Sequence, residues 1–158
     1  MVAPTTYNDS DRYYEGVISP NLIDLPSFSP PLNIGVMASG EGTNLQAIAN
    51  SIKNKTLQAN ICRLIVNNPD CNAINKAMDF KIPFTILDHR NFKSREDYDL
   101  KIAEIFKSES VEGIVMAGWM RIVTNTLLNQ FPNRIINIHP SILPNFKGIN
   151  AINQAIRY

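Results

Sequence analysis

This chain of 158 residues lacks the features that mark a membrane-spanning or a nucleic-acid-binding protein. No window approaches the roughly 18 uninterrupted apolar residues of a membrane span, and the N-terminal stretch carries acidic residues where a secretory signal would carry an apolar core. No five like charges stand in succession and the formal net charge is +1, which argues against a polybasic surface. We therefore expect a cytoplasmic protein with no nucleic-acid or membrane partner and with a small, anionic ligand.

Metal-binding patterns and late acidic residues are missing too. Cys62 and Cys71 have no CxxC spacing and no histidine cluster beside them, so we interpret them as ordinary thiols and expect no metal. No acidic residue follows Glu112, whereas cations continue at Arg121, Arg134, Lys147 and Arg157. This basic region either attracts phosphate or carboxylate ligands, or is basic only because acidic neighbouring sequence lies outside this chain.

The composition and the hydrophobic pattern of the sequence change near residue 33. Residues 1–32 are predicted to form an irregular N-terminal arm, because polar residues there are interrupted by Pro4, Pro20, Pro26, Pro30 and Pro31. Over residues 33–158, short apolar runs alternate with amphipathic stretches, as they do in βαβ units. A hydrophobic share of 44% is enough for one buried core. We predict one α/β domain over residues 33–158, built on a doubly wound, mostly parallel sheet.

The individual elements follow from the same periodicity. The expected strands are short and nearly all apolar, as strands covered on both faces are; they are Asn33–Ala38, Ile61–Asn67, Phe84–Asp88, Gly113–Ala117 and Arg134–Ile138. The expected helices are Asn44–Ile52, Asn72–Phe80, Ser94–Phe106, Thr124–Gln130 and one that begins at Asn150. Ser94 followed by Asp97 approximates a capping box, so the third helix should begin there.

The first candidate site is the stretch SGEGTN, in which the first strand runs through a glycine-rich turn into a helix. Such a turn exposes backbone N–H groups at the positive end of a helix, where they hold a phosphate. Gly40 and Gly42 permit close approach, and Thr43 and Asn44 add side-chain donors. The stretch matches neither a P-loop nor a GxGxxG fingerprint, which favours a nucleotide monophosphate or a sugar phosphate. A tight turn with Thr43 as the helix cap explains the spacing equally well.

The second candidate site is the stretch NIHPSILP, directly after the fifth expected strand. Ligands of open α/β sheets bind beyond the carboxyl ends of the strands, and the prolines stiffen this loop. His139 is an acid or base near neutral pH, and Asn137 is a donor for an oxyanion. A structural role is the commoner one for a lone histidine and stays open here. His89 follows the third strand and is interpreted as a loop residue.

The third candidate site is the stretch AGWMRIV, after the fourth expected strand. Trp119 and Met120 form either a flat apolar wall for an aromatic ligand, with backbone donors nearby, or part of the core. Arg95 stands in the first turn of a helix, where a cation gains nothing from the helix dipole. It is either a partner for a ligand carboxylate or an ordinary surface arginine.

With these residues in view, the chain from about Asn33 to Tyr158 resembles phosphoribosylglycinamide formyltransferase, the glycinamide ribonucleotide transformylase of purine synthesis. Four segments match in order: SGEGTNLQAI resembles the family's phosphate loop, SREDYD a helix start on the folate side, AGWMRI the folate pocket, and NIHPSILPNFKG the catalytic strand and loop. The HPS-x-LP element is shared with methionyl-tRNA formyltransferase and formyltetrahydrofolate deformylase. The glycine loop points to the glycinamide ribonucleotide branch and to a Rossmann-like formyltransferase fold.

The resemblance implies a role for each matching position. The phosphate of the ribonucleotide would be held by Gly42, Thr43 and Asn44, and the folate site would be lined by Arg95, Met120, Arg121, Ile122, Val123 and Asn137. His139 and Asn137 would lie at the formyl group. The substrate amine would attack the formyl carbon of 10-formyltetrahydrofolate, and protonated His139 and the Asn137 amide would stabilise the oxyanion of the tetrahedral intermediate. No metal is required, and a homodimer is left open.

The chain also departs from the family. Thr43 replaces the usual Ser and Trp119 the usual Phe, each with its chemical character kept. The family's Asp downstream of the histidine has no counterpart, so the domain is expected to be C-terminally incomplete and His139 mostly neutral at pH 7. We expect little or no transformylase activity from this chain alone. A formyltetrahydrofolate hydrolase and a non-catalytic domain that binds a phosphoribosyl ligand are the alternative hypotheses.

Overall fold

A computed structural model describes residues 27–138 and 151–157 of the chain. Its centre is a five-stranded sheet with the order β3-β2-β1-β4-β5, in which every neighbouring pair is parallel. The strands are β1 (Leu32–Ala38), β2 (Ala59–Val66), β3 (Phe84–Ile86), β4 (Gly113–Met116) and β5 (Ile135–Asn137). All five expected strands are therefore confirmed, with ends that differ by one or two residues. The doubly wound, parallel α/β fold that the sequence predicts is confirmed with them.

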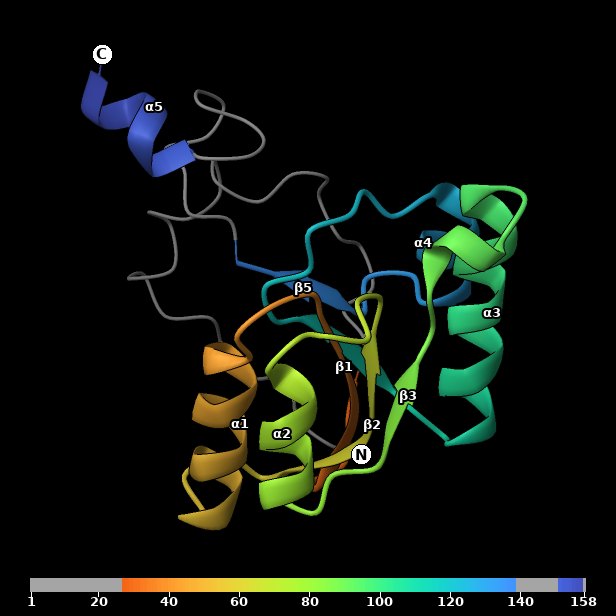
Figure 1. Cartoon of the computed structure of the whole chain (residues 1–158). Coiled ribbons are helices and arrows are strands. Elements are labelled where there is room, and N and C mark those ends of the chain that lie inside the picture. Colours follow the sequence, from red (N-terminus) through yellow and green to blue (C-terminus); the bar gives the residue numbers. More distant parts are fainter. Residues whose placement is uncertain (1–26, 139–150, 158) are drawn as a thin grey trace, which may run out of the picture.

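Helices cover both faces of the sheet (Figure 1). They are α1 (Thr43–Lys53), α2 (Ala73–Asp79), α3 (Arg95–Ser108) and α4 (Asn125–Gln130), and α5 (Ala151–Arg157) follows near the end of the chain. Helices α1 and α2 pack on one face and α3 and α4 on the other. The alternation of side chains along a strand divides the core in the same way, since Val36 belongs to the first cluster and Met37 to the second.

The start of α3 is set by a side-chain cap. Ser94 lies before the first helical turn in an extended conformation, and its hydroxyl oxygen accepts a hydrogen bond from the Asp97 N–H at 3.0 Å. The predicted capping position is therefore confirmed. Helix α1 begins differently, because its N-cap is Gly42 with φ 68° and no side chain caps the helix. The interpretation of Thr43 as the cap was wrong, since Thr43 is already the first helical residue.

The strand order places a topological switch point between β1 and β4. From β1 the chain moves outward through β2 to β3, and then it crosses over to β4 on the other side of β1. The loops after β1 and β4 therefore leave the same edge of the sheet in opposite directions, which is where open α/β sheets bind ligands. Residues 1–26, most of the expected N-terminal arm, and His139 lie outside the described residues.

Candidate functional site

Two hydrogen bonds join the loops that follow β1 and β4. The Ser39 N–H donates to the Gly118 carbonyl oxygen at 3.2 Å, and the Met120 N–H donates to the Ser39 hydroxyl oxygen at 2.9 Å. Gly118 adopts φ 78°, which glycine tolerates without strain and which turns the chain back toward β1. The glycine-rich stretch and the AGWMRIV stretch, whose Ser39 and Met120 are 81 residues apart in sequence, thus share the switch point between β1 and β4.

The turn before α1 carries the three residues predicted to hold a phosphate. Gly42 is buried, whereas the side chains of Thr43 and Asn44 are exposed at the first turn of the helix. The N–H groups of a first helical turn have no acceptor inside the helix, and the helix dipole makes this end positive. The exposed hydroxyl and amide therefore lie beside free backbone donors, an arrangement that suits a phosphate.

Helix α2 fixes the shape of this turn. The Ala73 N–H donates to the Gly40 carbonyl oxygen at 3.0 Å, and the Asn72 amide donates to Glu41 Oε2 at 3.2 Å. A Cβ on Gly42 would lie 2.8 Å from the Ala73 Cα, whereas a Cβ on Gly40 would meet nothing within 4 Å. The absence of a side chain at Gly42 is thus required by the close packing of this turn against Ala73 of α2.

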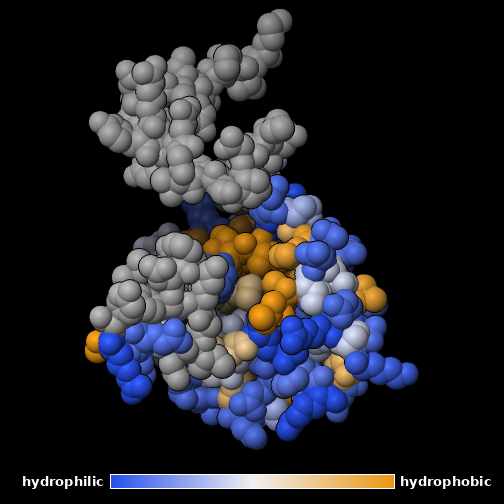
Figure 2. Space-filling model, turned by 90° about the horizontal axis from the view of Figure 1, so that it is seen from above, coloured by the Kyte–Doolittle hydropathy of each residue, from blue (hydrophilic) through white to orange (hydrophobic). Residues whose placement is uncertain are grey.

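The loop after β4 divides its side chains between the core and the surface. Trp119 is buried and stacks on Tyr98 of α3, with ring centroids 6.3 Å apart and an interplanar angle of 9°. For Trp119 the core interpretation is therefore correct. Met120 and Ile122 are 75% and 77% exposed, and Figure 2, seen from above Figure 1, shows hydrophobic side chains gathered at this end of the molecule. Within this loop, the exposed apolar surface thus comes from Met120 and Ile122 rather than from the indole.

Arg121 contacts the same tyrosine ring. Its guanidinium carbon is 5.3 Å from the centroid of the Tyr98 ring, a cation–π distance. The Tyr98 hydroxyl donates to the Leu87 carbonyl oxygen at 2.9 Å, and burial raises the pKa of this phenol, so it stays a neutral donor. Tyr98 thereby links the loop after β4 to the end of β3.

The remaining predicted site residues lie near the carboxyl edge of the sheet. No hydrogen bond or ion pair from them to the loops after β1 and β4 is described. Asn137 ends β5, where it pairs in register with Met116 of β4, and it is exposed. Val123 is half-buried and packs against the α3 side of the core. Arg95 is the exposed first residue of α3, one turn before Tyr98, and no ion pair is described for it.

Sequence reasoning missed three residues that organise the site: Ser39, Tyr98 and Asp99. Tyr98 belongs to the buried face of α3, and its contacts with the loops after β3 and β4 leave no periodic signal in the sequence. His89 begins a short 3-10 helix, η2 (His89–Asn91), where its Nδ1 is 3.9 Å from Asp88 Oδ1 and lacks a hydrogen-bond partner. His89 was interpreted as a loop residue, and the structure places it in this 3-10 helix within the connection between β3 and α3.

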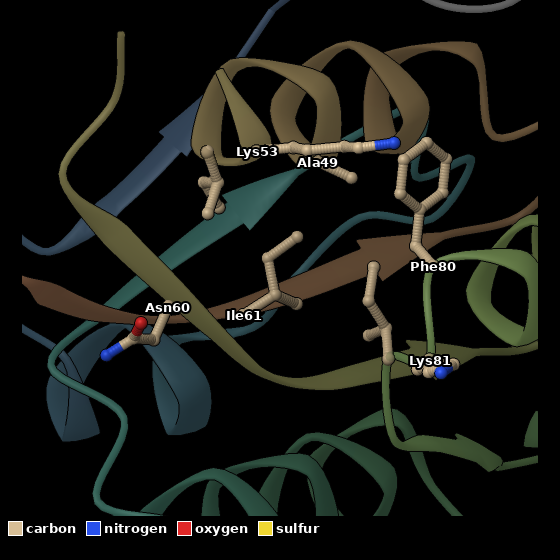
Figure 3. Close-up of a pocket in the computed structure, with 8 residues that line it drawn as sticks. Ala49, Lys53, Asn60, Ile61, Phe80 and Lys81 are labelled. Atoms are coloured by element: carbon tan, nitrogen blue, oxygen red, sulfur yellow. The ribbon is translucent and has the colours of Figure 1, made fainter. Parts of the chain in front are cut away.

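Other features of the described residues lie away from this edge. A cavity of about 330 Å³ is lined by Ala49, Ile52, Lys53, Asn60, Ile61, Phe80, Lys81 and Ile82 (Figure 3). It lies near the end of α1 and the start of β2, at the opposite end of the sheet from the switch point. Both thiols are free, and burial raises the pKa of Cys62 and of Cys71. Within residues 27–138 and 151–157, no cluster of His, Cys, Asp or Glu is arranged to hold a metal ion, and every helix is too short or too polar to cross a bilayer.

The fold and the joined loops define a doubly wound α/β protein with a candidate ligand site at its switch point. Residues 32–158 match the formyl transferase family, and the chain belongs to that family. It is 37% identical over 122 residues to phosphoribosylglycinamide formyltransferase of Bacillus subtilis, and 38% identical over 120 residues to the trifunctional purine biosynthetic protein adenosine-3 of Gallus gallus. The resemblance drawn from the four sequence segments is confirmed.

The solved structures give the same result. The crystal structure of phosphoribosylglycinamide formyltransferase from Bacillus halodurans superposes with a TM-score of 0.76 and 38% identity, over 79% of this chain and 64% of that one. The match to the Bacillus subtilis protein covers 77% of this chain and 63% of that relative, and the match to the Gallus gallus protein covers 76% and 12%. The chain thus spans less than two thirds of the length of these relatives.

Proposed function

We propose that this protein takes part in transfer of a formyl group from 10-formyltetrahydrofolate to the amine of glycinamide ribonucleotide, in purine synthesis. The observation that carries the proposal is the pair of hydrogen bonds through Ser39, which joins a phosphate-type turn to the loop after β4. Two ligands that must react with each other need neighbouring sites, and this contact makes the two loops neighbours. The names of the Bacillus relatives support the same reaction.

The first-turn residues of α1 are proposed to hold the ribonucleotide. The phosphate would accept hydrogen bonds from backbone N–H groups after Gly42, with the Thr43 hydroxyl and the Asn44 amide as further donors. Glu41 would repel a phosphate, but its carboxylate accepts the hydrogen bond from Asn72 and is thereby held toward α2. The donor set of the turn therefore fits a dianion.

The loop after β4 is proposed to hold the folate. Met120 and Ile122 offer exposed apolar surface for a flat ring, and no protein acceptor is described for the backbone N–H groups of Arg121, Ile122 or Val123. Free backbone donors beside apolar side chains suit a polar heterocycle, which needs both. Arg95 is proposed to pair with a carboxylate of the same ligand.

Asn137 and His139 are proposed to serve the reacting atoms. The substrate amine forms a bond to the formyl carbon, and the bond from that carbon to the folate nitrogen breaks as this nitrogen takes up a proton. The Asn137 amide donates to the developing oxyanion, and His139 in its protonated form donates to it as well. His139 also assists transfer of the proton from the amine to the folate nitrogen. The cytoplasm is the proposed location.

Calorimetric titration with glycinamide ribonucleotide tests the phosphate site without relying on turnover. The double variant Thr43→Ala, Asn44→Ala should raise the dissociation constant about tenfold or more, since it removes two hydrogen bonds to a charged group. Gln46→Ala is the matched control, because Gln46 is equally exposed on α1 but lies beyond the free N–H groups. Unchanged affinity in the double variant would refute the phosphate site.

Product analysis with a labelled formyl donor separates the alternatives. Release of labelled formate in the absence of the ribonucleotide would instead identify a formyltetrahydrofolate hydrolase. A non-catalytic domain would bind the ribonucleotide saturably but not the formyl donor, a distinction that does not depend on turnover, of which little or none is expected from this chain alone. Neither alternative is favoured by a specific contact in the structure.

A further inference from the structure

A buried carboxylate on α3 binds the end of the loop after β4. Asp99 is only 3% exposed. Its Oδ2 accepts hydrogen bonds from the Thr124 N–H at 2.5 Å and from the Thr124 hydroxyl at 2.8 Å. No salt bridge to Asp99 is described, so these two hydrogen bonds are what compensates the burial of its charge. Because both hydrogen bonds come from Thr124, the buried carboxylate strongly restrains the position of that residue.

The segment between Met120 and Thr124 is therefore held at both ends. The Met120 N–H is bound to the Ser39 hydroxyl at 2.9 Å, and Thr124 is bound to Asp99. The three residues between them donate no backbone hydrogen bond that the structure describes, and Ile122 is 77% exposed. Between these two anchors, no backbone hydrogen bond of the segment itself is described that would fix its conformation.

The residue before Asp99 acts on the same segment. Tyr98 stacks on Trp119, lies under the guanidinium of Arg121 and is itself fixed by its bond to the Leu87 carbonyl oxygen. Two consecutive residues of α3 thus orient the loop: Tyr98 contacts the side chains of Trp119 and Arg121, and Asp99 binds the N–H and the hydroxyl of Thr124. Because α3 is a helix of 14 residues with a buried face, it is a rigid support.

We propose that Asp99 is a positioning residue for the folate site: it holds the backbone of residues 121–123 ready before the formyl donor binds. The inference rests on the proposed function, which assigns the donor to this loop. A loop ordered in advance loses less conformational entropy on binding, and this raises affinity without any contact between Asp99 and the ligand. The effect should be confined to the folate and spare the ribonucleotide, whose turn is anchored by α2 instead.

The test measures two ligands on matched variants. Asp99→Ala should weaken binding of 5-formyltetrahydrofolate, a stable probe, about tenfold and leave binding of glycinamide ribonucleotide within about twofold of the wild type. Asp99→Asn keeps an acceptor oxygen for Thr124 and should restore most of the affinity. Asp97→Ala is the control, because Asp97 carries the same charge on the same helix but is exposed.

Trp119, the single tryptophan of the chain, gives a second readout. Iodide should quench its fluorescence more strongly in Asp99→Ala than in the wild type, because the released loop exposes the indole. If Asp99→Ala does not fold, Thr124→Val, which removes only the hydroxyl donor, should show the same folate-selective loss to a smaller degree.

Three outcomes overturn the inference and are distinguishable. Folate affinity that is unchanged in Asp99→Ala would show that Asp99 does not position the loop, with the proposed function intact. Equal weakening of both ligands would show a general structural role. Failure of the wild type to bind the folate probe while it binds the ribonucleotide would refute the donor site itself, and the role of Asp99 with it.

Discussion

Replacing Gly42 by alanine should destabilise the protein far more than the same change at Gly40, two residues earlier in the same turn. Gly42 has φ 68°, a conformation that costs an L-residue roughly 1–2 kcal/mol. An added Cβ would also lie 2.8 Å from the Cα and 2.9 Å from the Cβ of Ala73. The neighbouring atoms belong to backbone and to a short side chain, so α2 itself would have to move.

The expected loss of unfolding free energy follows from these terms. Forcing a methyl group into a filled space typically costs about 1–3 kcal/mol. A Gly→Ala change also restricts the unfolded chain, which returns about 0.4–1 kcal/mol. Together these terms give a net loss of about 1–5 kcal/mol for Gly42→Ala, to be compared with the roughly 5–15 kcal/mol by which domains are stable. For Gly40→Ala, where the Cβ meets open space, we expect a change between zero and a gain of about 1 kcal/mol.

Urea unfolding followed by far-ultraviolet circular dichroism measures both variants on the same footing. The midpoint should fall clearly for Gly42→Ala, with an unchanged slope, and stay or rise slightly for Gly40→Ala. Equal effects of the two substitutions would refute the reasoning, because they would show that neither the positive φ nor the contact with α2 requires glycine. The two glycines would then have to be explained by the ligand alone.

Two further predictions concern the polar contacts around β3 and α3. Ser94→Ala should cost about 1 kcal/mol of unfolding free energy in a urea titration, since it removes the acceptor for the Asp97 N–H, and Ser108→Ala, near the other end of the helix, should cost less. Hydrogen bonds from the Arg90 side chain and N–H lower the pKa of Asp88 to about 2, so its contribution is present above about pH 4 and is lost as pH falls toward 2. The melting temperatures of wild type and Asp88→Asn should therefore converge on acidification, and a constant difference between pH 6 and pH 3 would contradict the assignment.

The sequence was sufficient for the order and type of the elements because each strand is a short apolar run with a turn signal behind it. Parallel strands covered on both faces need this composition, and the run Gly113–Ala117 contains almost nothing else. The capping role of Ser94 could be predicted equally well, because a hydroxyl residue three positions before an acidic residue is typical of a helix N-terminus. The ends of β2 and β3 were less accurate, since ladder pairing across the sheet decides where a strand stops and that pairing is not local.

The side chains that organise the site were harder to predict for the same reason. The hydroxyl of Ser39 binds an N–H that lies 81 residues further along the chain, and Asp99 binds Thr124 across 25 residues. Neither contact leaves a spacing that periodicity or a motif can report. Asp99 stands on the helical face that carries Tyr98, Ile102 and Phe106, where a charged residue looks like an exception to the apolar pattern.

A buried carboxylate such as that of Asp99 can contribute to the stability of the fold or can orient a neighbouring segment. A carboxylate in a core is destabilising unless its hydrogen bonds are satisfied, so Asp99 adds less to the stability of α3 than an apolar residue of similar volume would. The carboxylate instead orients the loop after β4, because both of its hydrogen-bond donors belong to Thr124, at the end of that loop. We therefore explain the carboxylate at this core position by the proposed role of the loop in binding folate. The selective loss of folate affinity expected for Asp99→Ala tests this explanation.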